Sequence, residues 1–541
     1  MAEVAAIQRW TPVAAAVVMA GVIGWPLARL AGVAIEDGLA TVAATLTGRL
    51  VGVAIWNTVW TGALVAVLAA CTGTAAALVT ERLVVPARGW LRLGMFLPLV
   101  APPFVGAFGW ARAYGPRGLL DQVVGSDLPG LYGPVGVVLV LTVAATPVVW
   151  LIVAGALASR VEPDVERAAR ASGAGPLMTL WTVTLPLLRP ALGSSAAVAF
   201  VFAVNAFGVP AVLGIPAGFA TITTRIYQDL ALSGEQAAFI RVTTLAVTLV
   251  VLAFAVVGSA DALFTRRSAT RTALPAGGGS HGPGGVAIAL VMGAVIVVTT
   301  IVPFVAIALT ALTRAIGLAP VPENWSLANF GQALDGRFVD GLVHSLILAT
   351  AAASTVSLLG ALLAALRGRA TMLGTAVTLG FAIPGSALAV AVLLAYGRWL
   401  GDTLAIIFLA YVAKFWALGH RQLAGSIDRL PPDQLRAGRA SGGGSFDVLR
   451  SIIIPLLRPS IVAGWLVVFV FALHELTMSS LLYGPTSATL AVVVLNAQQL
   501  GDPTVTAALA VLMTGLVLLA AAPLAVLGVG RRSRGPWAPA R

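Results

Sequence analysis

The pentapeptide PLLRP occurs twice in this chain of 541 residues, at 186–190 in TLPLLRPAL and at 455–459 in IIPLLRPSI. The two copies are 269 residues apart, which is about half the chain. A looser match follows, because FVFAVNAFGVPAVLG from Phe200 resembles FVFALHELTMSSLLYG from Phe469. The flanking pairs at the same offset are Pro163 with Pro432, Asp164 with Asp433, Arg167 with Arg436, Ala168 with Ala437, Arg170 with Arg439, and Gly173 with Gly442. The chain therefore contains two homologous halves.

The composition is that of a membrane protein. The chain is 59% hydrophobic and 10% charged, with a mean hydropathy of +0.97, well outside the range of soluble domains. Apolar runs of about 20 residues are long enough to cross a bilayer. Twelve such runs are expected near residues 11–30, 54–79, 91–110, 133–158, 190–213, 242–264, 286–312, 341–366, 372–396, 404–418, 459–482 and 504–529. The first is too long for a signal peptide, so we expect it to be retained.

The charge distribution predicts the orientation of these spans. The net charge of +12 comes from arginines and a single lysine, Lys414. Arginines concentrate in alternate loops, and acidic residues concentrate in the others, a pattern typical of cytoplasmic and outer loops respectively. We therefore expect a multi-pass protein of the plasma membrane, in contact with lipid and with both termini in the cytoplasm. The basic charge then reflects topology, and no nucleic acid partner is expected.

The halves are joined by RRSATRTALPAGGGSHGPGG, residues 266–285, whose Gly, Ser and Pro content predicts a flexible cytoplasmic linker. Residues 1–265 and 286–541 are then two repeats of six spans with the same orientation. The sequence predicts an all-α membrane protein with about twelve transmembrane helices in two parallel six-helix repeats. One cysteine and four scattered histidines give no expectation of a disulfide, a metal site or a cofactor.

The loop before each PLLRP copy has the features of two short helices. Pro163 and Pro432 suit the first turn of a helix, and Gly173 and Gly442 suit its left-handed end. A second apolar helix follows, and we expect Pro186 and Pro455 to break the chain before the next span. A pair of amphipathic helices resting on the membrane surface is the alternative interpretation of one such loop.

Two copies of this loop resemble the EAA motif of binding-protein-dependent ABC importer permeases. Ala168, Ala169, Gly173 and Pro186 fit that motif in the first copy, and Ala437, Gly442 and Pro455 fit it in the second. Arg167 and Arg436 occupy the position of the family's glutamate, and Gly438 replaces the second alanine of the second copy. The resemblance covers nearly the whole chain, because six spans per motif also match the family.

The resemblance implies a permease of the type I importer fold and its partners. In the family this loop is the coupling helix that docks on the ATPase, so we expect two copies of an ATP-binding subunit and an extracytoplasmic solute-binding protein. A phosphate-binding GxxxxGK[ST] loop needs a lysine before Ser or Thr, and Lys414 precedes Phe415. The chain is therefore expected to be a transport subunit rather than an enzyme, with ATP hydrolysis on a separate chain. A secondary transporter is the alternative class, although it would have no ATPase to contact.

Cargo is indicated by weaker signals. FGVPAVLG, ITTRIYQDL and HELTMSSLLYGP resemble ferric-iron importers, and similar fused permeases serve thiamine and aminoethylphosphonate. Asn205, His474 and Glu475 lie within apolar runs, where polar groups usually face a cavity or a partner. We expect them to line the translocation pathway, and hydrogen bonding between helices is the alternative. Glu475 could attract a hard cation or a cationic organic substrate.

The topology can be tested at the linker. A cysteine replacing Gly278, in a Cys71→Ala background, should react only with membrane-permeant thiol reagents in intact cells, because the arginine pattern places the linker inside. Labelling by an impermeant reagent would contradict the expected orientation.

Overall fold

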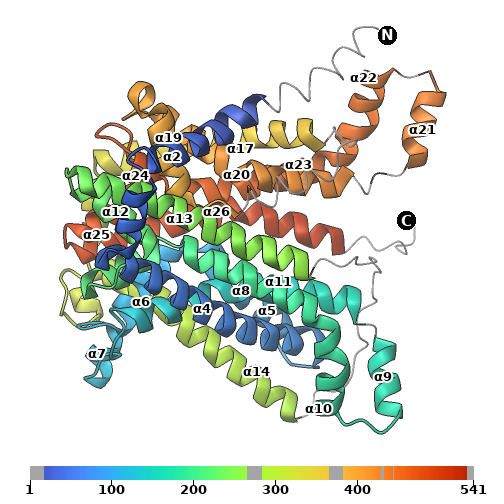
Figure 1. Cartoon of the computed structure of the whole chain (residues 1–541). Coiled ribbons are helices and arrows are strands. Elements are labelled where there is room, and N and C mark those ends of the chain that lie inside the picture. Colours follow the sequence, from blue (N-terminus) through green and yellow to red (C-terminus); the bar gives the residue numbers. More distant parts are fainter. Residues whose placement is uncertain are drawn as a thin grey trace. The chain divides into compact units, whose positions relative to one another are not determined.

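The structure, a computed structural model, describes residues 17–161, 163–264, 283–364, 380, 382–427, 430, 432–442 and 444–532. Most of the expected linker, residues 266–282, lies outside this part of the chain. Within it, regular secondary structure is helical, apart from one isolated bridge between Thr313 and Trp325 (Figure 1). The predicted all-α class is confirmed.

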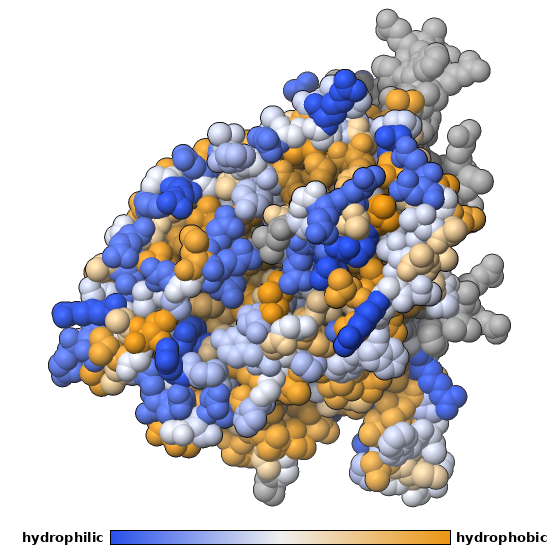
Figure 2. All heavy atoms as spheres, turned by 60° about the vertical axis from the view of Figure 1, so that its left-hand side comes forward, coloured by the Kyte–Doolittle hydropathy of each residue, from blue (hydrophilic) through white to orange (hydrophobic). Residues whose placement is uncertain are grey.

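Ten helices of the described residues are long and apolar enough to cross a membrane, or 11 when a bent pair counts as one span. Hydrophobic side chains also reach the surface in several places in the view of Figure 2, as expected for a protein surrounded by lipid. The expected run 372–396 lies partly outside the described residues, and its described part is the shorter helix α19, Gly385–Leu400. The ten are Val17–Ala34, Arg49–Arg82, Pro134–Ser159, Pro176–Asn205, Gln236–Ser259, Gly284–Leu312, Gly336–Ala361, Leu404–Ile427, Arg450–Leu473 and Pro503–Pro523.

The third expected span is not one straight helix. The chain forms α5, Arg88–Val100, and α6, Pro103–Tyr114, with a bend of 104° between the two helical stretches. Ala101 and Pro102 adopt extended conformations at the bend. Pro102 and Pro103 have no N–H to continue the helix, which explains the break. The apolar run expected over 91–110 is thus formed by a bent pair of helices.

The prolines of PLLRP, in contrast, do not break the chain. The short helix α10, Pro176–Thr179, continues through a π-turn, Leu180–Thr184, into α11, Leu185–Asn205. The same π-turn stands before Pro455, where Leu449–Ile453 leads into α23, Ile454–Leu473. A π-turn widens the helix, so it can accept a proline ring that would clash with a regular preceding turn. The expected breaks at Pro186 and Pro455 were wrong.

The described helices group into two compact units. The α4 unit comprises Ala43–Ala333 and Gly501–Val511, and the α17 unit comprises Met1–Val42, Leu334–Leu500 and Leu512–Arg541. In the α4 unit, three mutually packed helices form the centre: α4 (Arg49–Arg82), α8 (Pro134–Arg160) and α11. In the α17 unit, α17 (Gly336–Ala364), α20 (Leu404–Ile427) and α23 pack in the same way. The repeat detected in the sequence is thus a repeat of helix packing.

The first helix of each sequence half belongs to the unit built by the other half. The α17 unit includes α2, Trp25–Ala34, which packs on α19, and Tyr396 donates a hydrogen bond to the carbonyl of Gly21 at 2.7 Å. The α4 unit includes α14 (Pro283–Ile296) and α15 (Val302–Leu312), which pack on α5 and α6. The compact units therefore do not coincide with residues 1–265 and 286–541.

The remaining helices complete the two units. In the α4 unit they are α7 (Leu119–Val124), α9 (Pro163–Ala171), α12 (Ile222–Leu232), α13 (Gln236–Phe264) and α16 (Ala328–Ala333). In the α17 unit they are α21 (Pro432–Ala440), α22 (Ser445–Val448), α24 (Ser479–Leu482) and α25 (Leu490–Gln499). The last long helix is α26, Pro503–Arg532.

Glycine permits the closest approach of the central helices. A Cβ atom at Gly73 of α4 would lie 2.7 Å from Cβ of Val149 and 3.0 Å from the carbonyl oxygen of Thr146, both on α8. In the α17 unit, a Cβ atom at Gly419 of α20 would lie 2.6 Å from a methyl carbon of Val356 on α17. Small residues at helix crossings are a recurring feature of membrane proteins, because they let backbones pack closely.

We expect Gly73→Ala to destabilise the protein by about 1–3 kcal/mol, because the added methyl group overpacks the α4–α8 crossing. Gly155→Ala in α8 is the matched control, since no atom lies within 4 Å of the added carbon. The measurement is SDS-induced unfolding of the purified protein in detergent micelles. Equal stability of the two variants would contradict this account of the crossing.

Candidate functional site: broken helices and paired loops

The two repeated loops form the helical hairpins that their sequences predict. The first loop, residues 161–184, holds α9, α10 and a π-turn, and the second loop, residues 430–453, holds α21, α22 and a π-turn. Gly173 has φ +90° and Gly442 has φ +81°, so both glycines adopt the left-handed conformation expected at the helix end. No atom lies within 4 Å of a Cβ added at either glycine, so the conformation alone favours glycine there.

The arginines at the position of the family's glutamate are exposed. Arg167 forms an ion pair with Asp164 on its own helix, and Arg436 lies 3.4 Å from Asp433 in the same way. Ala168 and Ala437 are exposed beside these arginines, and Ala169 is half-buried. Pro186 is half-buried, whereas Pro455 is exposed. Exposed ion pairs of this kind contribute little to stability. This face of each loop is therefore open to a partner.

The first loop also exposes an apolar surface. Leu177, Met178 and Trp181 are 68%, 59% and 64% exposed, and Val165 of α9 is exposed beside them. Large exposed apolar patches mark surfaces that contact a partner or a membrane. Within the α4 unit, α9 and α10 lie at the end of α8 opposite to α7 (Figure 1).

The fifth span of each half ends at the polar residues predicted to line a pathway. In the α4 unit, α11 ends at Asn205, and the chain unwinds before the next helical turn at Pro210. In the α17 unit, α23 ends at Leu473, and the short helix α24 begins at Ser479. His474 and Glu475 therefore lie in a break, and the expected runs 190–213 and 459–482 each contain an interruption.

Glu475 has a clear local contact set. Its carboxylate accepts hydrogen bonds from the backbone N–H of Met478 at 3.0 Å and of Ser479 at 3.2 Å. It thus stabilises the free N–H groups at the start of α24, where a negative charge also meets the positive helix end. Tyr411 of α20 bonds the Ser479 hydroxyl at 2.7 Å, which joins the break to the central helices.

Lys414 joins this break to another. Its ammonium group donates to the carbonyl oxygen of Ile383 at 2.6 Å, just before Pro384 starts α19. The hydrogen bonds of α19 begin with the Pro384 carbonyl, which accepts from Leu388 N–H, so the preceding Ile383 carbonyl needs another donor. Lys414 and Tyr411 lie about one turn apart on α20, so the same helix contacts both breaks. The sequence had suggested no role for Lys414, because periodicity does not show which break a long side chain can reach.

The two charged residues at these breaks, Lys414 and Glu475, occur only in the second half. At the offset of 269 residues, Ala145 and Ala206 stand where the second half has Lys414 and Glu475. Asn205 corresponds to His474, and the Oδ1 atom of Asn205 and the Nδ1 atom of His474 are both buried without a hydrogen-bond partner among the described residues. The Thr223 hydroxyl donates to the Ala206 carbonyl at 2.8 Å and stabilises the break in the first half.

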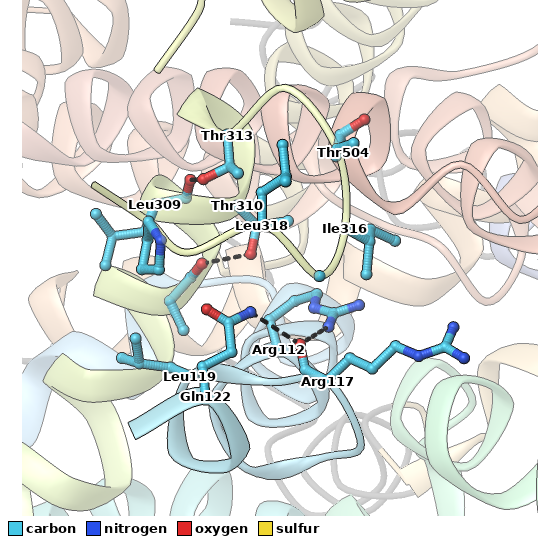
Figure 3. Close-up of a pocket in the computed structure, with 14 residues that line it drawn as sticks. Arg112, Arg117, Leu119, Gln122, Leu309, Thr310, Thr313, Ile316, Leu318 and Thr504 are labelled. Carbon is cyan, nitrogen blue, oxygen red and sulfur yellow. Dashed lines mark hydrogen bonds between the residues drawn. The ribbon is translucent and has the colours of Figure 1, made fainter. Parts of the chain in front are cut away.

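A small open hollow lies in the α4 unit between the α6–α7 segment and the loop after α15 (Figure 3). Arg112 and Gln122 both donate to the carbonyl of Arg117, at 3.1 and 3.3 Å. Neither Arg112 nor Arg117 has a carboxylate within ion-pair distance in the part of the chain that the structure describes. The hollow therefore presents two arginines, and the nearby Asp121 carboxylate bonds the backbone N–H of Arg117 at 2.9 Å rather than either guanidinium.

No group of three or more His, Cys, Asp or Glu side chains among the described residues is placed to hold a metal ion. The polar groups of the breaks instead act on backbone groups and on one another. Interrupted helices at equivalent positions of two repeats are typical of transport proteins, in which unwound backbone lines the substrate site.

Comparison with known proteins agrees with a transport protein. The family described as the inner membrane component of binding-protein-dependent transport systems matches residues 62–268 and again residues 356–530. Because these matches cover well over half of the chain, the protein belongs to this family. Family membership excludes the alternative of a secondary transporter, and the repeated match confirms a two-repeat permease.

Several relatives are similar over a large part of the chain. The ferric transport system permease protein FbpB of Actinobacillus pleuropneumoniae is 27% identical over 465 residues, which cover 80% of this chain and 65% of that protein. The Fe(3+)-transport system permease protein FbpB 2 of Haemophilus influenzae is 23% identical over 78% of this chain and 79% of its own length. The putrescine transport system permease protein PotI of Escherichia coli is 28% identical over only 37% of this chain and 76% of its own.

We expect Glu475→Ala to lower the free energy of unfolding by about 1–3 kcal/mol, because two backbone N–H groups lose their acceptor in a buried break. Glu323→Ala, at an exposed loop position, is the control and should change little. Detergent-phase unfolding of the two purified variants measures the difference. Equal stability would show that the Glu475 carboxylate does not stabilise α24.

Proposed function

We propose that this chain forms the complete translocation pathway of an ATP-driven importer, with its two loops docked on a pair of separate ATPase subunits. The doubled loop carries this proposal: each copy has a left-handed glycine between two short helices and an exposed face beside it. A surface helix resting on lipid would explain one copy, but it would not explain why both copies keep the same glycine spacing. The exposed alanines leave room for close approach of a partner.

The proposed orientation places both loops and both termini in the cytoplasm. The arginine pattern supports this side for the loops, in agreement with a cytoplasmic ATPase. The 27 residues of α8 separate the first loop from the Arg112 hollow by about 40 Å, which is enough to cross the membrane. The hollow would then face the solute-binding protein, whose acidic side chains would complement its charge.

Ferric iron is the proposed cargo. The support comes from two relatives named for ferric transport that match about four fifths of this chain, whereas the putrescine relative matches only 37% of it. Glu475 and His474 would meet the cargo at the break, together with Asn205 in the first half. A carboxylate and an imidazole are suitable ligands for iron. The small number of ligands suits a brief contact with the cargo, because a pathway must release what it binds.

We expect Gly173→Leu and Gly442→Leu each to reduce ATPase binding and transport, because a side chain at φ near +90° is strained and also projects into the proposed docking face. Gly125→Leu is the matched control, since Gly125 ends α7 with φ +75° and likewise has open space around it. The measurements are co-purification of the ATPase and uptake into reconstituted vesicles. Normal assembly and uptake in both loop variants would overturn the docking assignment.

The cargo is tested with the reconstituted complex. Binding protein loaded with ferric iron should stimulate ATP hydrolysis, and Glu475→Gln should reduce iron uptake while leaving the complex assembled. Stimulation by thiamine, aminoethylphosphonate or putrescine, but not by ferric iron, would overturn the iron assignment and leave the permease assignment intact.

A further inference from the structure

A buried polar cluster joins the first loop to the ends of the membrane helices. Arg82, the last residue of α4, donates through Nη2 to the carbonyl oxygens of Val161 at 2.6 Å and Leu157 at 3.3 Å, where α8 ends. Its Nε lies 3.7 Å from Oε1 of Glu166 on α9. The Thr184 hydroxyl, just before α11, donates to the same Oε1 atom at 2.7 Å. A single carboxylate thus joins α9 to α4 and to the start of α11.

Glu166 differs from its neighbours on α9. Glu166 is 8% exposed, whereas Asp164 and Arg167 are more than two thirds exposed and form an ion pair with each other. The glutamate therefore faces the membrane helices, while the residue at the family's glutamate position faces outward. Because Glu166 is buried and bonded within its own chain, it is not available to a docked partner.

The cluster continues along the last turn of α4. Arg92 of α5 forms an ion pair with Glu81 at 2.6 Å and donates to the carbonyl of Thr80 at 3.2 Å. Trp150 of α8 donates to the Thr80 hydroxyl at 2.9 Å. The end of α4 is therefore bonded to α5, α8 and α9. Hydrogen bonds and ion pairs are directional, so they hold these helix ends in a defined orientation.

The second loop cannot form the same contacts. At the offset of 269 residues, Leu435 replaces Glu166 and Ile453 replaces Thr184. Gly438 of α21 packs closely on apolar side chains instead, since a Cβ atom there would lie 2.5 Å from Ile452 and 3.3 Å from Val448. Apolar contacts are not directional, so they constrain orientation less than a bonded carboxylate does.

We propose that Glu166 is a positioning residue that makes the two coupling loops mechanically unequal. Movement of the first loop is carried by bonded contacts into α4, α8 and α11, whereas the second loop has Leu435 and Ile453 in place of the carboxylate and the hydroxyl and packs on apolar side chains at Gly438. The inference rests on the proposed function, because it concerns how ATP-driven motion reaches the membrane helices. It predicts that loss of the Glu166 contacts uncouples ATP hydrolysis from transport without dissociating the ATPase.

The test compares three changes in the full complex. Glu166→Leu with Thr184→Ile copies the second loop and removes the carboxylate and the hydroxyl together, while Arg82 keeps its bonds to the Val161 and Leu157 carbonyls. Thr184→Val removes only the hydroxyl, and Thr184→Ser keeps it. Ser259→Ala is the control, because its exposed hydroxyl donates only to the Val256 carbonyl of its own helix, α13, at 3.0 Å. Each variant is measured for ATPase co-purification, basal ATP hydrolysis, and cargo transported per ATP hydrolysed.

We expect the double variant and Thr184→Val to lower cargo transported per ATP by about fivefold or more, the usual lower bound of coupling between sites. Thr184→Ser and Ser259→Ala should behave as wild type, and all variants should keep the ATPase bound. Equal transport per ATP for Thr184→Val and Thr184→Ser would overturn the inference, even if the double variant failed to fold. A wild-type chain that binds no ATPase would overturn the proposed function, and this inference with it.

Discussion

The need to pair every backbone group within the bilayer governs this structure. Hydrocarbon offers no hydrogen-bond partner, so each interruption of a helix leaves N–H and C=O groups that the protein must satisfy. The carboxylate of Glu475 accepts the free N–H groups before α24, the ammonium of Lys414 reaches the Ile383 carbonyl, and the Thr223 hydroxyl reaches the carbonyl of Ala206. Polar side chains in the membrane are therefore first of all partners of broken backbone.

The same constraint explains which prolines break helices and which do not. At Pro102 and Pro103 two successive N–H groups are missing, and the chain bends by 104°. A lone proline such as Pro186 or Pro303 follows a π-turn instead, and the helix continues because the N–H of the residue directly before the proline reaches a carbonyl five residues back. Among the described residues, helix breaks thus occur at a few places, and the polar groups that could contact a transported molecule lie at those places.

The two halves have the same helix packing but different buried polar residues. Their central helices pack alike and both break the fifth span at corresponding residues. The charged residues at the helix breaks, Lys414 and Glu475, belong to the second half, whereas the buried carboxylate of Glu166 belongs to the first. In a fused chain the repeats evolve separately, so one half can specialise in the membrane junction and the other in the loop contact.

The sequence alone determined the repeat, the membrane class, the paired loops and the glycines at their ends. These properties follow from local patterns: length of apolar runs, arginine asymmetry, and residues with restricted backbone conformations. Tertiary structure alone decided that the first helix of each half packs in the unit of the other half, that His474 and Glu475 lie in a break, and that Glu166 faces inward beside an exposed Arg167. The reason is physical. A side chain's partner depends on which distant helix end lies within about 3 Å of it, and no local pattern in the chain carries that information.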